Sequence, residues 1–193
     1  MPVNKRRVVQ PFITPRIQGD IVPGVRGGRP FTNLYSVAMA NCDSKTGSIA
    51  NPSSGTSSTD TTNQMQGAGC IKVITTAPNA YFSDDATSRP VIIPGQWYTF
   101  RCMMKGNAGG EVVTFTPVYR NLADSTITPT IPTASFTLTT DWREYKMIIP
   151  EAPALAYKIR MNIYVAVAST IYVDTCGLAA GDMPYWIAGL SSS

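Results

Sequence analysis

The sequence predicts an all-β protein built as an antiparallel sandwich of two sheets, and three observations support this prediction. Residues 94–105 follow a Pro-Gly turn and place every second side chain on one apolar face, the period of a half-buried strand. Similar stretches recur at short, regular intervals down the chain, as in β-sandwiches. Charged residues make up only 15% of the chain, and Gly and Pro number 15 each, which favours strands and turns over helices.

The expected strands are taken in chain order, and together they account for most of the sequence after residue 30. They lie at 31–45, 69–76, 80–83, 94–105, 111–120, 133–140, 143–149, 157–168 and 170–175. Residues 46–64 are almost wholly small and polar, so we expect a long loop there. The clearest alternation is in 157–168, which sends Ile159, Met161, Ile163, Val165 and Val167 to one side and Lys158, Arg160, Asn162 and Tyr164 to the other.

Residues 1–30 have a different composition from the rest. They hold six basic residues and the single acid Asp20, whereas the whole chain carries a formal net charge of +4. Pro and Gly interrupt this segment repeatedly, so neither a helix nor a long central strand can persist. We therefore expect two parts, an extended N-terminal arm at 1–30 and a β-sandwich domain at 31–193.

The arm also keeps apolar pairs that a purely solvating tail would not need, which favours contact with a protein surface. The residues predicted to bind that partner are Lys5, Arg6, Arg7, Phe12, Ile13, Arg16, Arg26 and Arg29. Nucleic acid is the disfavoured partner, because the arm has no interleaved aromatic residue besides Phe12 and no helix to enter a groove.

Catalytic constellations are not recognisable in the sequence. It contains no His, which removes the commonest general base and the commonest transition-metal ligand. The adjacent acids Asp84 and Asp85 are expected in a solvated turn, and no phosphate-binding loop or nucleophile elbow occurs. The sequence therefore predicts a non-enzymatic protein without a cofactor or a metal.

Cysteine spacing bears on metal binding, and hydropathy bears on membrane spans and signal peptides. Cys42, Cys70, Cys102 and Cys176 form no CxxC pair, which disfavours thiolate metal binding. A buried free thiol is the favoured interpretation for Cys102, and the disulfide state of the four stays open. No apolar run is long enough for a membrane span or a signal peptide, so we expect neither.

Three stretches together resemble a known family. They are PGQWYTFRCMMKG at 94–106, FTLTTDWREYKMIIP at 136–150 and IYVDTCGLAAGDMPYW at 171–186. In this order they resemble the jelly-roll domains, similar to carbohydrate-binding modules, of tailed-bacteriophage structural proteins. The matching residues are Pro94, Gly95, Tyr98, Thr99, Phe100, Trp142, Arg143, Val173, Asp174, Leu178, Gly181, Tyr185 and Trp186. The resemblance covers about residues 31–187 and implies a jelly-roll sandwich.

Two departures from the family pattern bear on metal binding. Family members often open the domain with an Asn-Pro-x-Phe-Glu segment whose Glu joins the closing Asp in a calcium site, but this chain has Asn33-Leu34-Tyr35 there, without an acid. Ala179 also replaces the usual Glu after the closing strand. These departures argue against calcium at Asp174, for which the alternative role is capping backbone N–H groups of a loop.

The resemblance and the arm together imply a non-enzymatic virion structural accessory protein, a capsid decoration or a tail-attached protein. Its partners would be capsid or tail proteins of the same virion, with the chain a homo-oligomer or present in many copies, located in a virion assembled in the host cytoplasm. The alternative is a glycan-binding adhesin module for host surface carbohydrate, with Trp97, Tyr119 and Trp186 as candidate contacts. A secreted enzyme accessory domain is a third reading, disfavoured by the lack of a signal peptide.

Overall fold

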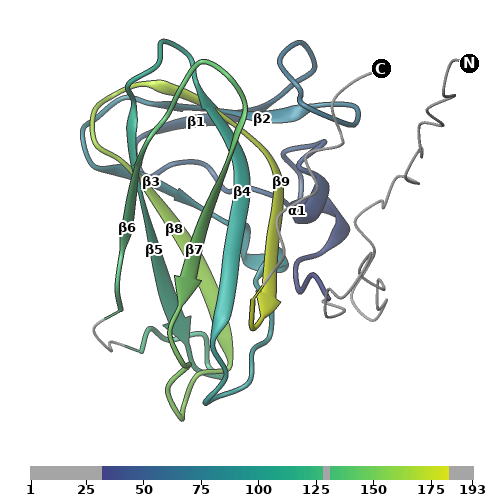
Figure 1. Ribbon diagram of the computed structural model, residues 1–193, viewed down its shortest axis with the longest axis vertical. Coiled ribbons are helices and arrows are strands. Elements are labelled where there is room, and N and C mark those ends of the chain that lie inside the picture. Colours follow the sequence, from purple (N-terminus) through teal and green to yellow (C-terminus); the bar gives the residue numbers. More distant parts are fainter. Residues whose placement is uncertain (1–31, 128–130, 183–193) are drawn as a thin grey trace, which may run out of the picture.

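Two antiparallel β-sheets face each other across one core in the computed structural model, which describes residues 32–127 and 131–182 (Figure 1). The described elements are α1 (Val37–Asn41), β1 (Gly55–Asp60), β2 (Cys70–Thr75), β3 (Ala80–Ser83), η1 (Ala86–Ser88), β4 (Tyr98–Gly106), β5 (Val112–Arg120), β6 (Ala134–Thr137), β7 (Arg143–Ile149), β8 (Lys158–Val165) and β9 (Thr170–Ala180). The five-stranded sheet has the order β1-β2-β9-β4-β7, and the four-stranded sheet has the order β3-β8-β5-β6. The predicted all-β, two-sheet jelly-roll architecture is therefore confirmed for the described residues.

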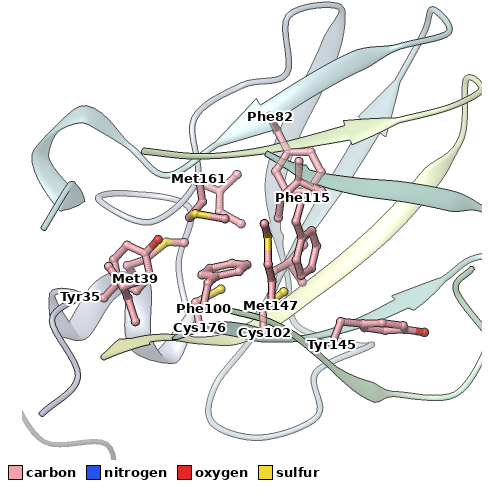
Figure 2. Close-up of a cluster of buried hydrophobic side chains, with 14 of the residues drawn as sticks. Tyr35, Met39, Phe82, Phe100, Cys102, Phe115, Tyr145, Met147, Met161 and Cys176 are labelled. Atoms are coloured by element: carbon pink, nitrogen blue, oxygen red, sulfur yellow. The ribbon is translucent and has the colours of Figure 1, made fainter. Parts of the chain in front are cut away.

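Aromatic rings from both sheets meet in the core (Figure 2). Phe100 of β4 and Phe115 of β5 lie 5.2 Å apart between ring centroids, and Phe136 of β6 packs 4.9 Å from Phe115. Each ring lies at a core-facing position of its strand, as the period of two in the sequence predicted. Removing a buried ring of this kind typically costs about 3–5 kcal/mol, because the cavity left behind collapses only in part.

The expected strand at 31–45 is wrong in the described part of that segment, because a short helix forms instead. Ser36 caps α1 by accepting a hydrogen bond from the Met39 amide, and Cys42 ends the helix in the left-handed region at φ 54°. Tyr35 and Met39 are buried as expected, whereas Val37 is 41% exposed. The helix delivers its apolar residues to the core at one end of the sandwich, beside β9.

Residues 46–64 are also more ordered than the predicted long loop. Gly55–Asp60 form β1, which pairs antiparallel with β2 at the edge of the five-stranded sheet. Gly55 enters this strand at φ +130°, and a Cβ there would collide with the Ile74 carbonyl oxygen. Small polar side chains suit an edge strand that is largely solvated, which explains why β1 gives no hydrophobic signal.

The closing strand β9 is longer than predicted and carries a bulge. It runs to Ala180 instead of ending near residue 175, and its pairing with β4 shifts between Cys102 and Met103. Thr175 takes up the extra residue with φ 34°. The bulge lets Val173 and Cys176 both face the core while Asp174 points to the other side of the sheet.

Candidate functional site

The outer face of the four-stranded sheet carries most of the polar chemistry that the core and the turns do not use. Alternation directs Ile159, Met161 and Ile163 of β8 into the core, so the intervening side chains point outward. The same holds for β3, β5 and β6. We call this surface the β8 face; it comprises Tyr81, Ser83, Val112, Thr114, Thr116, Val118, Arg120, Ser135, Thr137, Lys158, Arg160, Asn162 and Tyr164.

A tyrosine pair occupies one end of the β8 face. Tyr81 and Tyr164 are direct cross-strand partners, with ring centroids 5.2 Å apart and an interplanar angle of 43°. Both rings are half-buried, so part of each ring surface stays accessible. Thr114 and Ser135 continue this row across β5 and β6 and hydrogen-bond to each other at 2.8 Å. The row therefore combines an aromatic surface with neighbouring hydroxyl groups.

Asn162 lies in the next row, at the middle of the face. Ser83 and Thr116 flank it in register. Although its side chain points away from the core, Asn162 is only 2% exposed, so the surrounding side chains enclose it. Its Oδ1 is buried without a hydrogen-bond partner among the described residues. A buried amide oxygen without a partner carries a free-energy cost of about 1–3 kcal/mol, which a ligand donor or a water would relieve.

Three arginines gather at the opposite end of the face from the tyrosines. On β8, Arg160 lies one row from Asn162 on the side away from Tyr164. Arg120 of β5 pairs in register with Lys158. Arg89 reaches the same place from the chain after η1, because Val91 forms a bridge with Lys158 and thereby extends the sheet beyond β3. The Nε atoms of all three arginines are buried without a hydrogen-bond partner among the described residues.

Asp124 contacts two of these arginines, one through its carboxylate and one through its backbone carbonyl oxygen. Arg89 Nη1 lies 2.9 Å from Asp124 Oδ2, and Arg120 Nη1 donates to the Asp124 carbonyl oxygen at 2.6 Å. Asp124 is itself 47% exposed at its side chain, so solvent weakens this ion pair. Arg160 forms no such ion pair within residues 32–127 and 131–182, and its pKa is lowered by desolvation and then by the charges of Arg120 and Arg89.

The buried carboxyl nearest to this cluster does not neutralise it. Asp84 is 1% exposed, and burial raises its pKa to about 8, against the lowering effects of the Met161 amide and of Arg89 and Arg160. At neutral pH the group is therefore mostly protonated. Its Oδ1 accepts a hydrogen bond from the Met161 amide at 3.1 Å, which closes the β3–β8 ladder.

The face can hold a ligand along the direction of β8. From Arg120 and Lys158 to Tyr164 it spans four rows, or roughly 20 Å at the usual rise per strand residue. Ring surfaces, an enclosed amide and guanidinium groups offer stacking, hydrogen bonding and charge in sequence. Among the described residues, no group of three or more His, Cys, Asp or Glu side chains is arranged to hold a metal ion.

Comparisons with known proteins agree with this architecture. No protein-family model and no curated protein sequence matches the chain. Among solved structures, the chain is similar to the CBM22-1 xylan-binding domain of Paenibacillus barcinonensis Xyn10C, with TM-score 0.57 and 10% identity over 75% of this chain and 93% of that one. It is also similar to the C-terminal family 22 carbohydrate-binding module of Clostridium thermocellum Xyn10B, with TM-score 0.54 and 15% identity over 77% and 95%.

A phage protein is among these structural neighbours. The enzymatically active domain of bacteriophage CBA120 tailspike protein 4 matches with TM-score 0.55 and 12% identity, over 77% of this chain but only 21% of that one. Identities this low show the fold alone. The chain has the jelly-roll fold of carbohydrate-binding modules.

Of the three sugar contacts predicted from the sequence, two lie among the described residues of this jelly roll. Tyr119 is 1% exposed and donates from its hydroxyl to the Pro150 carbonyl oxygen at 2.7 Å, so its ring is a core ring and cannot reach a surface ligand. Trp97 is half-buried beside Gly181, at the end of the five-stranded sheet. Trp186 and the partner-binding residues of the arm, Lys5, Arg6, Arg7, Phe12, Ile13, Arg16, Arg26 and Arg29, lie outside the described residues.

The sequence predicted only one part of the β8 face, the polar side of the alternating strand at 157–168. The outward positions of Arg160, Asn162 and Tyr164 follow from the period of two. Their combination with Tyr81 and Arg89 does not, because those residues come from a segment far back in the sequence and reach β8 only through sheet pairing. No motif spacing could have joined them.

Asp174 serves as a cap in this structure. Its Oδ2 accepts hydrogen bonds from the Met65 and Gln66 amides at 2.8 and 3.2 Å. Burial raises the pKa of this carboxyl to about 6, while the amides act to lower it. The loop it caps is the one between β1 and β2, on the far side of the five-stranded sheet from the core.

Three of the four cysteines meet in the core. Cys42 Sγ lies 3.8 Å from Cys176 Sγ, and Cys102 is the direct cross-strand partner of Cys176 (Figure 2). All four cysteines are free and fully buried. Burial raises the pKa of the Cys70 thiol to about 12, which makes it an unreactive thiol near neutral pH. In the parts of the chain that are described, no helix is long and apolar enough to span a bilayer.

Proposed function

We propose that this protein is a non-catalytic carbohydrate-binding module whose β8 face holds the sugar chain. The observation that supports the proposal best is the pairing of the Tyr81 and Tyr164 rings one row from the enclosed amide of Asn162. A sugar offers C–H faces for the rings and hydroxyl groups for the neighbouring Thr114 and Ser135 side chains. The fold is shared with domains described as xylan-binding, which supports the same class of ligand.

Stacking explains why two tyrosines suit this role. A tyrosine ring combines a large apolar surface with a polar tip, so it can contact a ring-shaped polar ligand without losing hydration completely. The exposed hydroxyl groups of Thr114 and Ser135, in the same row as the two rings, then supply hydrogen bonds that orient the sugar, while Asn162 lies enclosed one row away.

A glycan array followed by calorimetry on the best ligand tests this proposal. Tyr164→Ala should lower the affinity about tenfold, since each aromatic contact contributes on the order of 1 kcal/mol beyond its buried area. Tyr164→Phe is the matched control, because it keeps the ring, and it should stay within about threefold of the parent. The proposal fails if no glycan binds, or if removing both rings with Tyr81→Ala and Tyr164→Ala leaves the affinity unchanged.

Attachment to a virion is the second candidate function, and two observations favour it. The fold is shared with a bacteriophage tailspike domain, and six basic residues are concentrated in residues 1–30. In this reading the protein is a capsid decoration or tail-attached protein, present in many copies and held to neighbouring subunits by its arm. Deleting residues 1–28 should then abolish attachment while the β-strand circular dichroism signal is kept. Attachment that survives the deletion would contradict this function.

A further inference from the structure

The arginine cluster gives the β8 face a charge that a neutral sugar would not use. Arg89, Arg120 and Arg160 converge at one end of the face, and Lys158 lies beside Arg120 in the next strand. Close positive charges repel one another, so a folded protein gains nothing from gathering them unless anions balance the charge. The source of that balance therefore indicates what the cluster is for.

The protein supplies only part of the balancing charge. Asp124 contacts Arg89 through its carboxylate and Arg120 through its backbone carbonyl oxygen. Asp85 lies close enough to Arg89 to have its pKa lowered by that charge, but its carboxylate is engaged mainly in capping Thr87. Both acids therefore balance mainly the positive charge of Arg89.

Arg160 is left on the other side, facing Arg120 and Arg89. Among the described residues, the one carboxyl whose charge acts on Arg160 is Asp84, which is buried and has its pKa raised to about 8. Arg160 lies one row from Asn162, the residue with the enclosed and unpartnered amide oxygen. Arg160 is therefore a partly exposed guanidinium with no ion pair among the described residues, and it lies beside an enclosed polar residue.

A purely structural role explains this arrangement poorly. The Arg89–Asp124 ion pair does connect the chain after η1 to the β5–β6 loop, but exposed pairs of this kind stabilise proteins by about 1 kcal/mol at most. Arg160 has no such pair among the described residues. A guanidinium is well suited to bidentate contact with a planar carboxylate or with sulfate, and charge-assisted hydrogen bonds of this type are about twice as strong as neutral ones.

We infer that the ligand of the β8 face is an acidic carbohydrate, whose anionic group binds at Arg89, Arg120 and Arg160 while a neighbouring sugar ring lies toward Asn162 and the Tyr81–Tyr164 pair. The inference rests on the proposed function and adds the class of ligand to it. The anionic group is a carboxylate or a sulfate, since both share the charge and the oxygen geometry that a guanidinium recognises.

Calorimetry on the full chain with three oligosaccharides of similar length tests the inference. Oligogalacturonate carries carboxylates, sulfated dextran oligomers carry sulfates, and xylohexaose is neutral. One of the acidic ligands should bind at least tenfold more tightly than xylohexaose, and its affinity should fall as salt is raised, because ions screen the contact. Comparing the two acidic ligands identifies the anionic group.

Two single-charge variants show whether the contact is local. Arg160→Gln should lower affinity for the acidic ligand about tenfold or more and leave any xylohexaose binding within twofold. The matched control is Lys72→Gln on β2, which removes one positive charge from the other sheet and should leave both affinities unchanged. Equal losses in the two variants would indicate unspecific attraction and overturn the inference.

The remaining outcomes distinguish a failure of the acidic-ligand inference from a failure of the proposed carbohydrate-binding function. Equal affinity for neutral and acidic ligands, with both lost in Tyr164→Ala, would overturn the acidic ligand and keep the carbohydrate-binding function. Binding of none of the three oligosaccharides, and of nothing on the glycan array, would overturn both. A single-stranded oligonucleotide that binds as tightly as the acidic sugar would overturn the assignment to carbohydrate.

Discussion

The outer faces of the two sheets differ in how some of their polar side chains are used. On the five-stranded sheet, Thr99 and Asp174 are completely buried, although they point away from the core between the sheets. Thr99 donates to the Gly181 carbonyl oxygen, and Asp174 accepts from two loop amides. On the four-stranded sheet, Arg160 and Tyr164 stay half-buried, and the Nε of Arg160 finds no partner among the described residues.

This difference distinguishes polar side chains that stabilise the fold from polar side chains that remain available for binding a ligand. Where backbone groups of the same chain satisfy a side chain, its removal exposes a defect in the fold and stability falls. Where a side chain keeps unused hydrogen-bonding capacity beside the surface, its removal changes little in the free protein, and the loss is felt on binding. The β8 face is therefore the better candidate for ligand contact, and the five-stranded sheet is the better candidate for structural support.

The largest expected effect that tests this comparison is on stability. Asp174→Ala leaves the Met65 and Gln66 amides without their acceptor, so we expect a loss of about 2–4 kcal/mol in the free energy of unfolding, measured by urea denaturation. Arg160→Gln should cost less than about 0.5 kcal/mol, because it removes a like-charge contact along with a partly exposed side chain. A larger loss from Arg160→Gln than from Asp174→Ala would reverse the roles assigned to the two faces.

A smaller effect, on the pH dependence of stability, distinguishes the two buried carboxyls. Because the folded state raises the pKa of Asp84 from 3.8 to about 8, the folded protein binds this proton more tightly than the unfolded chain does. The contribution of Asp84 to stability should therefore be highest below about pH 4, fall as the pH rises to about 8 and level off above it. Asp174 adds a fall of the same sign that ends near pH 6.

Urea midpoints measured at about pH 4.5, 6 and 8 test this dependence. Asp84→Asn keeps an oxygen to accept the Met161 amide hydrogen but has no proton to lose, so it should flatten the curve between pH 6 and 8. Asp174→Asn should flatten only the part below pH 6. Stability that rises from pH 6 to 8 in the parent protein would show that Asp84 is ionised in the folded state.

The smallest expected effect is on glycan affinity, and it concerns Trp97. This residue lies beside Gly181, at the end of the five-stranded sheet, and is not part of the β8 face. Trp97→Ala should therefore leave the affinity measured by calorimetry within twofold of the parent. A tenfold loss would move the binding site to the five-stranded side and restore the contact that the sequence predicted.

Most of the strands could be predicted from the sequence, and the reason is local. In β7 and β8, successive side chains point to opposite faces of the sheet, so the burial of Tyr145, Met147 and Ile163 appears in the sequence as a period of two. Where burial is not periodic the prediction failed. The edge strand β1 is small and polar, and α1 is too short for a helical period, being defined by its Ser36 cap and the left-handed Cys42.

The sequence by itself determined that this chain is a β-sandwich, that β8 has a polar and an apolar side, and that no His is available for chemistry. Only the tertiary structure decided that Tyr81 lies against Tyr164 and that Arg89 joins Arg120 and Arg160. The physical reason is that alternation within a strand is set by neighbouring residues, whereas the choice and register of a partner strand depend on burying the core as a whole. That choice assembled the tyrosines and arginines into one surface.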